Sequence, residues 1–129
     1  MAMPTQLPIR GRNGRLAEPL HMPDDPVVLA YIAGLMDGEG CITIKRQGRA
    51  VQITVTNTDK PVMEWLVQQM GGRLHMDAYK TLAGDREMWR WQIAAWANCH
   101  VFLSALLPYL RIKRAKALEA IAVIEEVAA

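Results

Sequence analysis

Nine residues, Ile32 to Gly40, constrain this chain more than any other part of its sequence. The run begins as an apolar helical segment in which Gly34 and Gly38 stand four residues apart, so that one helix face carries no side chains. A face of this kind lets a second backbone approach closely, as in helix pairs within membranes, and the steric cause applies equally in water. We therefore expect this helix to pack tightly against another one.

The same run ends in two carboxylates, Asp37 and Glu39, which alternate with Gly38 and Gly40. The C-terminus of a helix carries partial negative charge, and an acidic side chain there costs about 0.3–1 kcal/mol. Local rules of this kind are mostly broken at functional sites. A divalent cation would remove the conflict, because carboxylates are the hard oxygen ligands that such cations prefer. A buried helix with a glycine cap and a stray surface acid is the simpler alternative.

Hydrophobic periodicity and turn signals divide the chain into helices and strands. Asp24, Asp25 and Pro26 start the first helix, and Asn98 is expected to cap the third. We predict helices at 27–36, 61–70, 98–110 and 113–127, and strands at 41–45, 52–56, 73–80 and 87–96. This αββαββα order with a C-terminal helix predicts an α+β domain, with helices on one face of an antiparallel sheet.

Length and composition favour one domain at 25–129, preceded by a flexible basic arm at 1–24 that has four prolines and no hydrophobic period. A net charge of +2 is weak information by itself. Cys41 and Cys99 have no motif spacing, which indicates free thiols in a reducing intracellular compartment. The chain has neither a long apolar run nor a secretory signal, so we expect no membrane partner and no secretion.

Alternation along the strands gives the predicted sheet a polar second face. Arg and Gln, which hydrogen-bond bidentately to guanine and adenine edges in the major groove, are prominent there, and the face has a single acid. Ordinary solvent exposure is the alternative. The candidate DNA-contacting residues, if this face is a recognition surface, are Thr43, Lys45, Gln47, Arg49, Gln52, Thr54, Thr56, Arg73, His75, Asp77, Arg90 and Gln92.

The run at 32–40 resembles the signature of the LAGLIDADG homing endonucleases, with Ile32, Met36, Gly38 and Glu39 as mild departures. In that family, paired signature helices form the subunit interface and their last acids hold metal over DNA. The predicted architecture matches that of the family over about residues 25–127. Because the signature occurs once here, the resemblance implies a homodimer whose interface includes Ala33, Gly34, Asp37 and Gly38.

The resemblance also carries residue roles onto this sequence. Glu39, with Gly38 beside it, corresponds to the metal-binding position, and Asn57 and Lys113 correspond to catalytic positions that flank the metals. Asn57 stands where a well-studied branch has glutamine, and it could merely end a strand. Lys113, in the run Leu107 to Lys113, could be a solvated helix residue, and Arg111 is its rival. None of the three histidines has metal-ligand spacing; we place His21 in the tail, His75 on the sheet face and His100 on a helix surface.

These features together predict a homodimeric, sequence-specific double-strand DNA endonuclease of the intron-homing kind, with no small-molecule substrate. Mg²⁺, for which Mn²⁺ could substitute, would neutralise the phosphate, activate water and stabilise the leaving oxygen. The family implies a long pseudo-palindromic site and short 3′ overhangs. One alternative is a nucleic-acid-binding module without cleavage, either a splicing maturase or a transcriptional regulator. Another is a structural α+β dimer. The basic arm could contact the DNA backbone or have no role.

Overall fold

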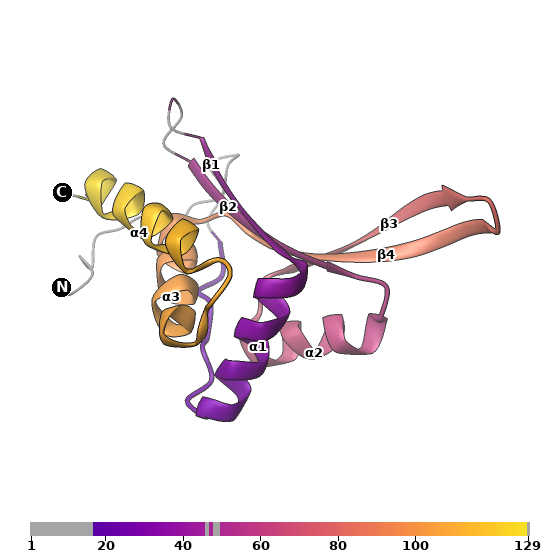
Figure 1. Cartoon of the computed structure of the whole chain (residues 1–129), viewed down its shortest axis with the longest axis horizontal. Coiled ribbons are helices and arrows are strands. Elements are labelled where there is room, and N and C mark those ends of the chain that lie inside the picture. The colour runs from indigo at the N-terminus through magenta and orange to yellow at the C-terminus, as the bar shows by residue number, and fades with distance from the viewer. Residues whose placement is uncertain (1–16, 46, 48–49, 129) are drawn as a thin grey trace.

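The computed structural model describes residues 17–45, 47 and 50–128. Its four strands form one antiparallel sheet in the order β1-β2-β4-β3, and its helices lie on one side of that sheet (Figure 1). The predicted αββαββα order with a C-terminal helix is confirmed. The elements are α1 (Pro26–Glu39), β1 (Gly40–Lys45), β2 (Ala50–Asn57), α2 (Lys60–Met70), β3 (Arg73–Thr81), β4 (Gly84–Ile93), α3 (Trp96–Leu106), the 3₁₀ turn η1 (Leu107–Tyr109) and α4 (Arg114–Ala128).

The signature helix α1 begins and ends at residues that suit those positions. The Asp25 carboxylate accepts a hydrogen bond of 2.9 Å from the N–H of Val27, and Pro26 occupies the first turn. The helix continues three residues beyond the predicted end at 36, so Asp37 and Glu39 both belong to its last turn. Gly40 then caps it in an extended conformation, and the position requires glycine because a Cβ there would lie only 2.6 Å from the Met36 carbonyl oxygen.

The core lies between the sheet and the helices that cover it. Trp91 of β4 is fully buried, and its ring centroid lies 5.2 Å from that of Phe102 on α3. The indole Nε1 of Trp91 donates a 2.7 Å hydrogen bond to the carbonyl of Gly71, which satisfies its polar group within the core. Burial of Trp91 and Ile93 confirms the predicted inner face of this strand.

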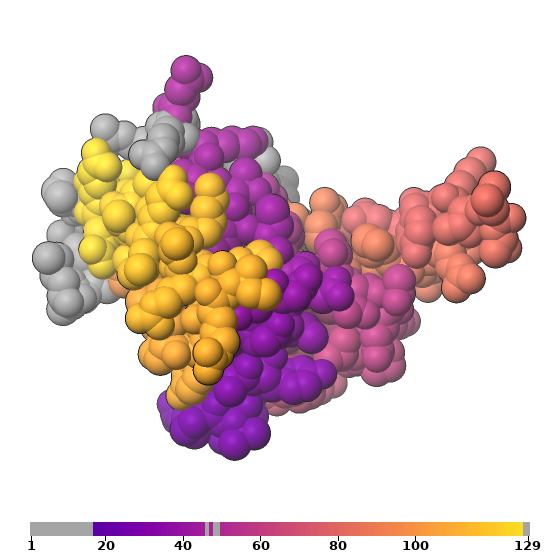
Figure 2. Space-filling model, in the orientation of Figure 1, coloured from indigo at the N-terminus to yellow at the C-terminus, as the bar shows by residue number. Residues whose placement is uncertain are grey.

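The sheet extends well beyond the helices at its β3–β4 end. These two strands form a ribbon that projects from the body (Figure 1; Figure 2). The pairing continues to Thr81 and Gly84 at the tip, where β4 begins, three residues earlier than predicted. Within the described part of the chain, no helix is long and apolar enough to cross a membrane.

The structure corrects the predicted end of β4 and the start of α3. The strand ends at Ile93, and α3 begins at Trp96 with Ala95 as its N-cap. Asn98 is therefore not a cap but a buried residue inside the helix. Its side-chain amide accepts a hydrogen bond from the N–H of Leu20 and donates one to the carbonyl of Glu18, both at 2.9 Å.

These contacts also correct the predicted extent of the N-terminal arm. Leu20 is buried in the core, and the backbone N–H of His21 donates a 2.9 Å hydrogen bond to the carbonyl of Met70. Residues 17–24 are thus packed on the domain, and the predicted domain boundary at residue 24 is too late. Arg10, Arg12 and Arg15 lie outside the described residues.

Candidate nucleic-acid interface and cleavage site

Ten of the twelve polar residues predicted to share one sheet face do share it. The strand register aligns Thr54 with Gln92 and Gln92 with Arg73, which forms a row across three strands. A second row joins Thr56, Arg90 and His75. In the described part of the chain, no helix covers this face (Figure 1). Thr43 pairs with Gln52, and Lys45 ends β1 on the same face.

Two predicted members of this face differ from the rest. Gln47 lies in the turn after β1 and not in the strand, since β1 ends at Lys45. Arg49 lies outside the described residues. The remaining set spans all four strands and keeps Asp77 as its only acid.

Asp77 has a specific partner on this face. Its Oδ2 atom lies 3.5 Å from Nε of Arg90, and both side chains are partly exposed. Nε itself makes no hydrogen bond, so the contact is electrostatic and not a directed pair. A guanidinium has five N–H donors, and within the described residues the contact with Asp77 involves Nε and not the terminal nitrogens.

Asp37, at the end of α1, is engaged within the chain. Its Oδ2 accepts the backbone N–H of Arg111 at 2.9 Å, and its Oδ1 accepts that of Lys113 at 3.0 Å. The Lys113 amine in turn donates a 2.7 Å hydrogen bond to the backbone carbonyl of Asp37. Burial would raise the pKa of Asp37, but the backbone N–H groups of residues 111–113 and the Lys113 charge together hold this pKa below its ordinary value.

Glu39 differs from Asp37 in having no such partner. It is exposed at the last position of α1, directly before β1 enters the sheet, and its carboxylate makes no hydrogen bond or ion pair within the described chain. The carbonyls of a helix's last turn lack partners in the helix itself. That of Met36 accepts the N–H of Gly40, and that of Asp37 accepts the Lys113 amine. The carbonyl of Gly38 is the next one along the helix, and it directly precedes Glu39 in the sequence.

Asn57 has the local role that we weighed against catalysis. Its side-chain oxygen accepts the N–H of Asp59 at 2.8 Å, which forms a turn between β2 and α2. In the sheet it pairs with Trp89, so alternation places it with the helix-side residues and not with the polar face. Its catalytic role stays a prediction.

The outer face of α1 is open in the single chain. A Cβ added to Gly34 or Gly38 would meet nothing within 4 Å. Val27 is 76% exposed and Tyr31 is 53% exposed, and they continue the glycine stripe towards the start of the helix. Figure 2 shows α1, in indigo, at the molecular surface. Ala33, predicted at the interface, is instead fully buried in the chain's own core, because it lies on the opposite side of the helix.

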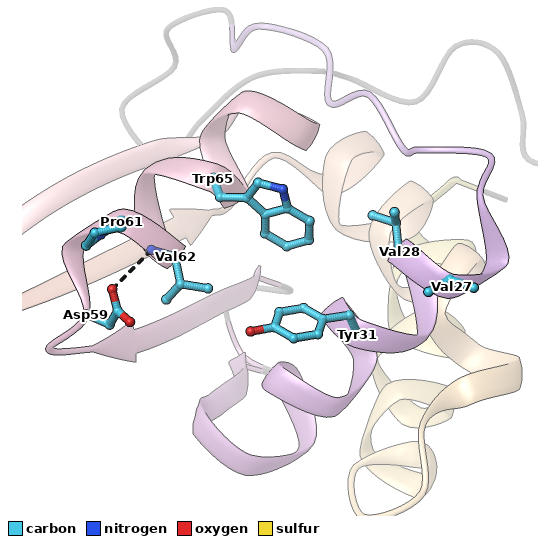
Figure 3. Close-up of a pocket in the computed structure, with 7 residues that line it drawn as sticks. All are labelled: Val27, Val28, Tyr31, Asp59, Pro61, Val62 and Trp65. Atoms are coloured by element: carbon cyan, nitrogen blue, oxygen red, sulfur yellow. Dashed lines mark hydrogen bonds between the residues drawn. The ribbon is translucent and has the colours of Figure 1, made fainter.

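A groove of about 560 Å³ lies between α1 and α2 beside this stripe (Figure 3). Tyr31 and Trp65 meet edge to face in it, with ring centroids 5.4 Å apart and planes at 86°. Val27 and Tyr31 were not predicted from the sequence as part of this exposed helix face. Together with the two glycines they occupy positions 27, 31, 34 and 38, and this spacing places all four on one side of the helix. The lining residues are Val27, Val28, Tyr31, Asp59, Pro61, Val62 and Trp65.

One histidine is misplaced by the sequence analysis, which puts His100 on a helix surface. His100 is only 7% exposed and lies between α3 and α4. Its Nε2 lies 3.1 Å from Glu125 Oε1, and its Nδ1 lies 3.3 Å from the Ser104 hydroxyl. These partners satisfy both ring nitrogens, so His100 is a structural residue. Among the described residues, no three His, Cys, Asp or Glu side chains gather closely enough to hold a metal ion.

Comparisons with known proteins agree with this geometry. The family model for a LAGLIDADG-like domain matches residues 26–107. A search of curated proteins finds no match. The homing endonuclease I-CvuI, solved in complex with the I-CreI target in the presence of Mg with the DNA not cleaved, aligns with a TM-score of 0.60 and 24% identity over 79% of this chain and 68% of that chain.

A second solved structure, the archaeal intron-encoded homing endonuclease I-Vdi141I complexed with DNA, has a TM-score of 0.59 and 16% identity over 79% of this chain and 69% of that chain. At these identities the two structures show a shared fold. The family model covers well over half of the chain, including all of α1 and the sheet. This chain therefore belongs to the LAGLIDADG family.

Proposed function

We propose that this protein is a DNA endonuclease that acts as a homodimer and cleaves both strands of a long pseudo-palindromic site. The observation that carries the proposal is the unpartnered Glu39 carboxylate, which lies where α1 meets the polar sheet. The structurally similar protein I-CvuI is solved with its own DNA target in the presence of Ca, and with the I-CreI target in the presence of Mg. These neighbours support DNA as the partner and a divalent cation as the cofactor.

The exposed face of α1 supports a second copy of this chain as its partner. Gly34 and Gly38 leave the backbone open, and Val27 and Tyr31 expose apolar surface beside them. Ile112, which is 76% exposed, lies within the segment that Asp37 holds against the end of the same helix. Two copies related by a two-fold axis along α1 would cover these groups and bring two Glu39 carboxylates together.

The donor groups fit Mg²⁺, with Mn²⁺ as a possible substitute. One chain offers Glu39 and the Gly38 carbonyl, which are hard oxygen ligands but too few for a protein-only site. Mg²⁺ usually keeps several waters and binds through one or two carboxylates plus phosphate oxygens. When bound, it would neutralise the scissile phosphate and lower the pKa of the attacking water.

The other residues of the chain bind and orient the DNA. The rows that contain Arg90, Gln92 and Thr54 face the major groove and read base edges by hydrogen bonding. The Lys113 amine, held at the end of α1, contributes positive charge where the phosphate becomes more negative. The projecting β3–β4 ribbon extends this contact along each half-site (Figure 2).

The target sequence must be found before cleavage can be tested. We would select bound duplexes from a random library with Ca²⁺ present, and then incubate the selected DNA with Mg²⁺ or Mn²⁺. We expect a two-fold symmetric consensus, Mg²⁺-dependent double-strand cleavage, and 3′ overhangs when the ends are mapped. Glu39→Gln serves as the matched control, since it keeps the shape and removes the charge.

The outcomes separate the proposal from its rivals. A consensus that is bound but never cut by the wild type in either metal would identify a binding module, such as a maturase or regulator, and would overturn the proposal. Failure to enrich any duplex or RNA hairpin would leave a structural dimer.

A further inference from the structure

The contacts between Asp37 and the segment at 111–113 are reciprocal. The carboxylate of Asp37 holds two backbone N–H groups of that segment, and the segment returns the Lys113 amine to the Asp37 carbonyl. The bonded residues are 74 and 76 positions apart in the chain. This three-bond contact, which we call the Asp37 latch, is thus the junction of two distant parts of the molecule.

The segment that the latch holds has no regular structure of its own. It lies between η1, which ends at Tyr109, and α4, which begins at Arg114. Leu110 before it is anchored by a 3.1 Å hydrogen bond from its N–H to the Leu106 carbonyl. For the N–H groups of Arg111 and Lys113, the carboxylate of Asp37 is the partner that the described structure provides. The carboxylate of Asp37 is therefore the side chain that holds the backbone N–H groups of this segment.

The latch also matches charge at two helix ends. The anionic carboxylate lies before the first turn of α4, where N–H groups are unpaired, and the cationic amine lies at the end of α1, where carbonyls are unpaired. An ammonium has three N–H donors. One of them is donated to the carbonyl of Asp37, which lies two residues before Glu39. The other two N–H groups of the ammonium are left for oxygens on the solvent side.

From this geometry we propose that Asp37 is a positioning residue, which sets the Lys113 amine at the end of α1, two residues before Glu39, by fixing the backbone of residues 111–113. This inference rests on the proposed nuclease function, because it assigns Lys113 a place at the reacting phosphate. Asp37 itself touches neither DNA nor cation. Each of its carboxylate oxygens accepts a backbone N–H group, and its effect on cleavage passes through Lys113.

The test compares Asp37→Asn with Asp25→Asn. Both change a carboxylate that accepts a backbone N–H next to a helix start, and Asp25 lies at the far end of α1. Amide exchange at Arg111 and Lys113 should accelerate about tenfold or more in Asp37→Asn, the size expected when a hydrogen bond to a charged group is lost. Exchange at Leu110, which bonds to a carbonyl, should stay as in the wild type.

Cleavage of the selected DNA then tests the positioning. Asp37→Asn should cut about a hundredfold more slowly, within the range for loss of a polar catalytic group, while binding in Ca²⁺ is unchanged. Asp25→Asn should cut at the wild-type rate. The double variant Asp37→Asn with Lys113→Met should be no slower than Lys113→Met alone, because residues that act through one another are not additive.

Two results would overturn the inference. One is an Asp37→Asn protein that cuts as fast as the wild type, and the other is a double variant whose two losses multiply. A wild type that cuts none of the DNA it binds would instead refute the proposed nuclease function. In that case amide exchange still decides whether Asp37 holds the Lys113 segment.

Discussion

The effect of adding a methyl group to the glycine stripe of α1 has opposite signs in one chain and in a pair. Within a single chain, a Cβ at Gly34 meets no atom within 4 Å. Gly34→Ala therefore creates no clash and removes a helix-disfavouring residue, worth about 0.8–1.0 kcal/mol of helix stability. For a domain of this size, that gain raises the midpoint of thermal unfolding by about 4 °C.

In the proposed homodimer the same methyl group would lie between two closely spaced backbones. Overpacking of a tight contact costs about 1–3 kcal/mol, and two-fold symmetry places the substitution in the interface twice. The dimer should therefore lose about 2–6 kcal/mol of association free energy, which weakens its dissociation constant about thirtyfold or more. Gly34→Leu should abolish pairing, while the isolated chain still folds.

Sedimentation velocity and thermal unfolding, each over a wide range of protein concentration, measure both effects. We expect the wild type to unfold at a temperature that rises with concentration, and Gly34→Ala to be more stable than the wild type only at concentrations where both are monomers. Gln68→Leu, on the exposed side of α2, controls for added apolar surface. Equal stabilisation by Gly34→Ala at every concentration, with unchanged association, would refute pairing through this stripe.

Three further predictions use other side chains. Glu39→Gln should lower cleavage by orders of magnitude while DNA binding in Ca²⁺ persists or tightens, because an anion facing phosphates is removed; near wild-type cutting in Mg²⁺ would reject Glu39 as the ligand. Because the pKa of Asp37 is held below its ordinary 3.8, its contribution to stability should be complete above about pH 4 and vanish as the pH falls further, so unfolding curves of the wild type and Asp37→Asn should converge in acid. Burial raises the pKa of the Cys99 thiol to about 12, so a thiol reagent at pH 8 should label exposed Cys41 rapidly and Cys99 only on unfolding, as mass spectrometry would show.

Elements with strong local signals could be predicted from the sequence. The Asp25–Pro26 start, the alternating strands and the end of the second helix at residue 70 are each decided by neighbouring residues, and the structure has all of them. The polar sheet face follows from the same period of two, since register preserves the alternation across strands.

The errors arise where a distant partner decides the role of a residue. Asn98 is a residue type that often caps a helix, but its amide hydrogen-bonds to the backbone of Glu18 and Leu20, about eighty positions away. His100 contacts Ser104 within its own helix, but its other partner, Glu125, comes from another helix. Ala33 shares the signature with Gly34, yet one position along a helix turns the side chain by about 100°, which directs it into the core.

The structure resolves the electrostatic conflict at the end of α1 for one of its two acids and not for the other. The unfavourable interaction of Asp37 with the helix end is offset because its carboxylate accepts the unpaired N–H groups before α4. The Lys113 amine also offsets the negative charge of the helix end. Neither contact reaches the carboxylate of Glu39, which stays exposed at the same helix end. One of the two signature acids is thus neutralised by the fold itself. The other, Glu39, keeps its charge exposed, and this is the acid that we propose as the cation ligand.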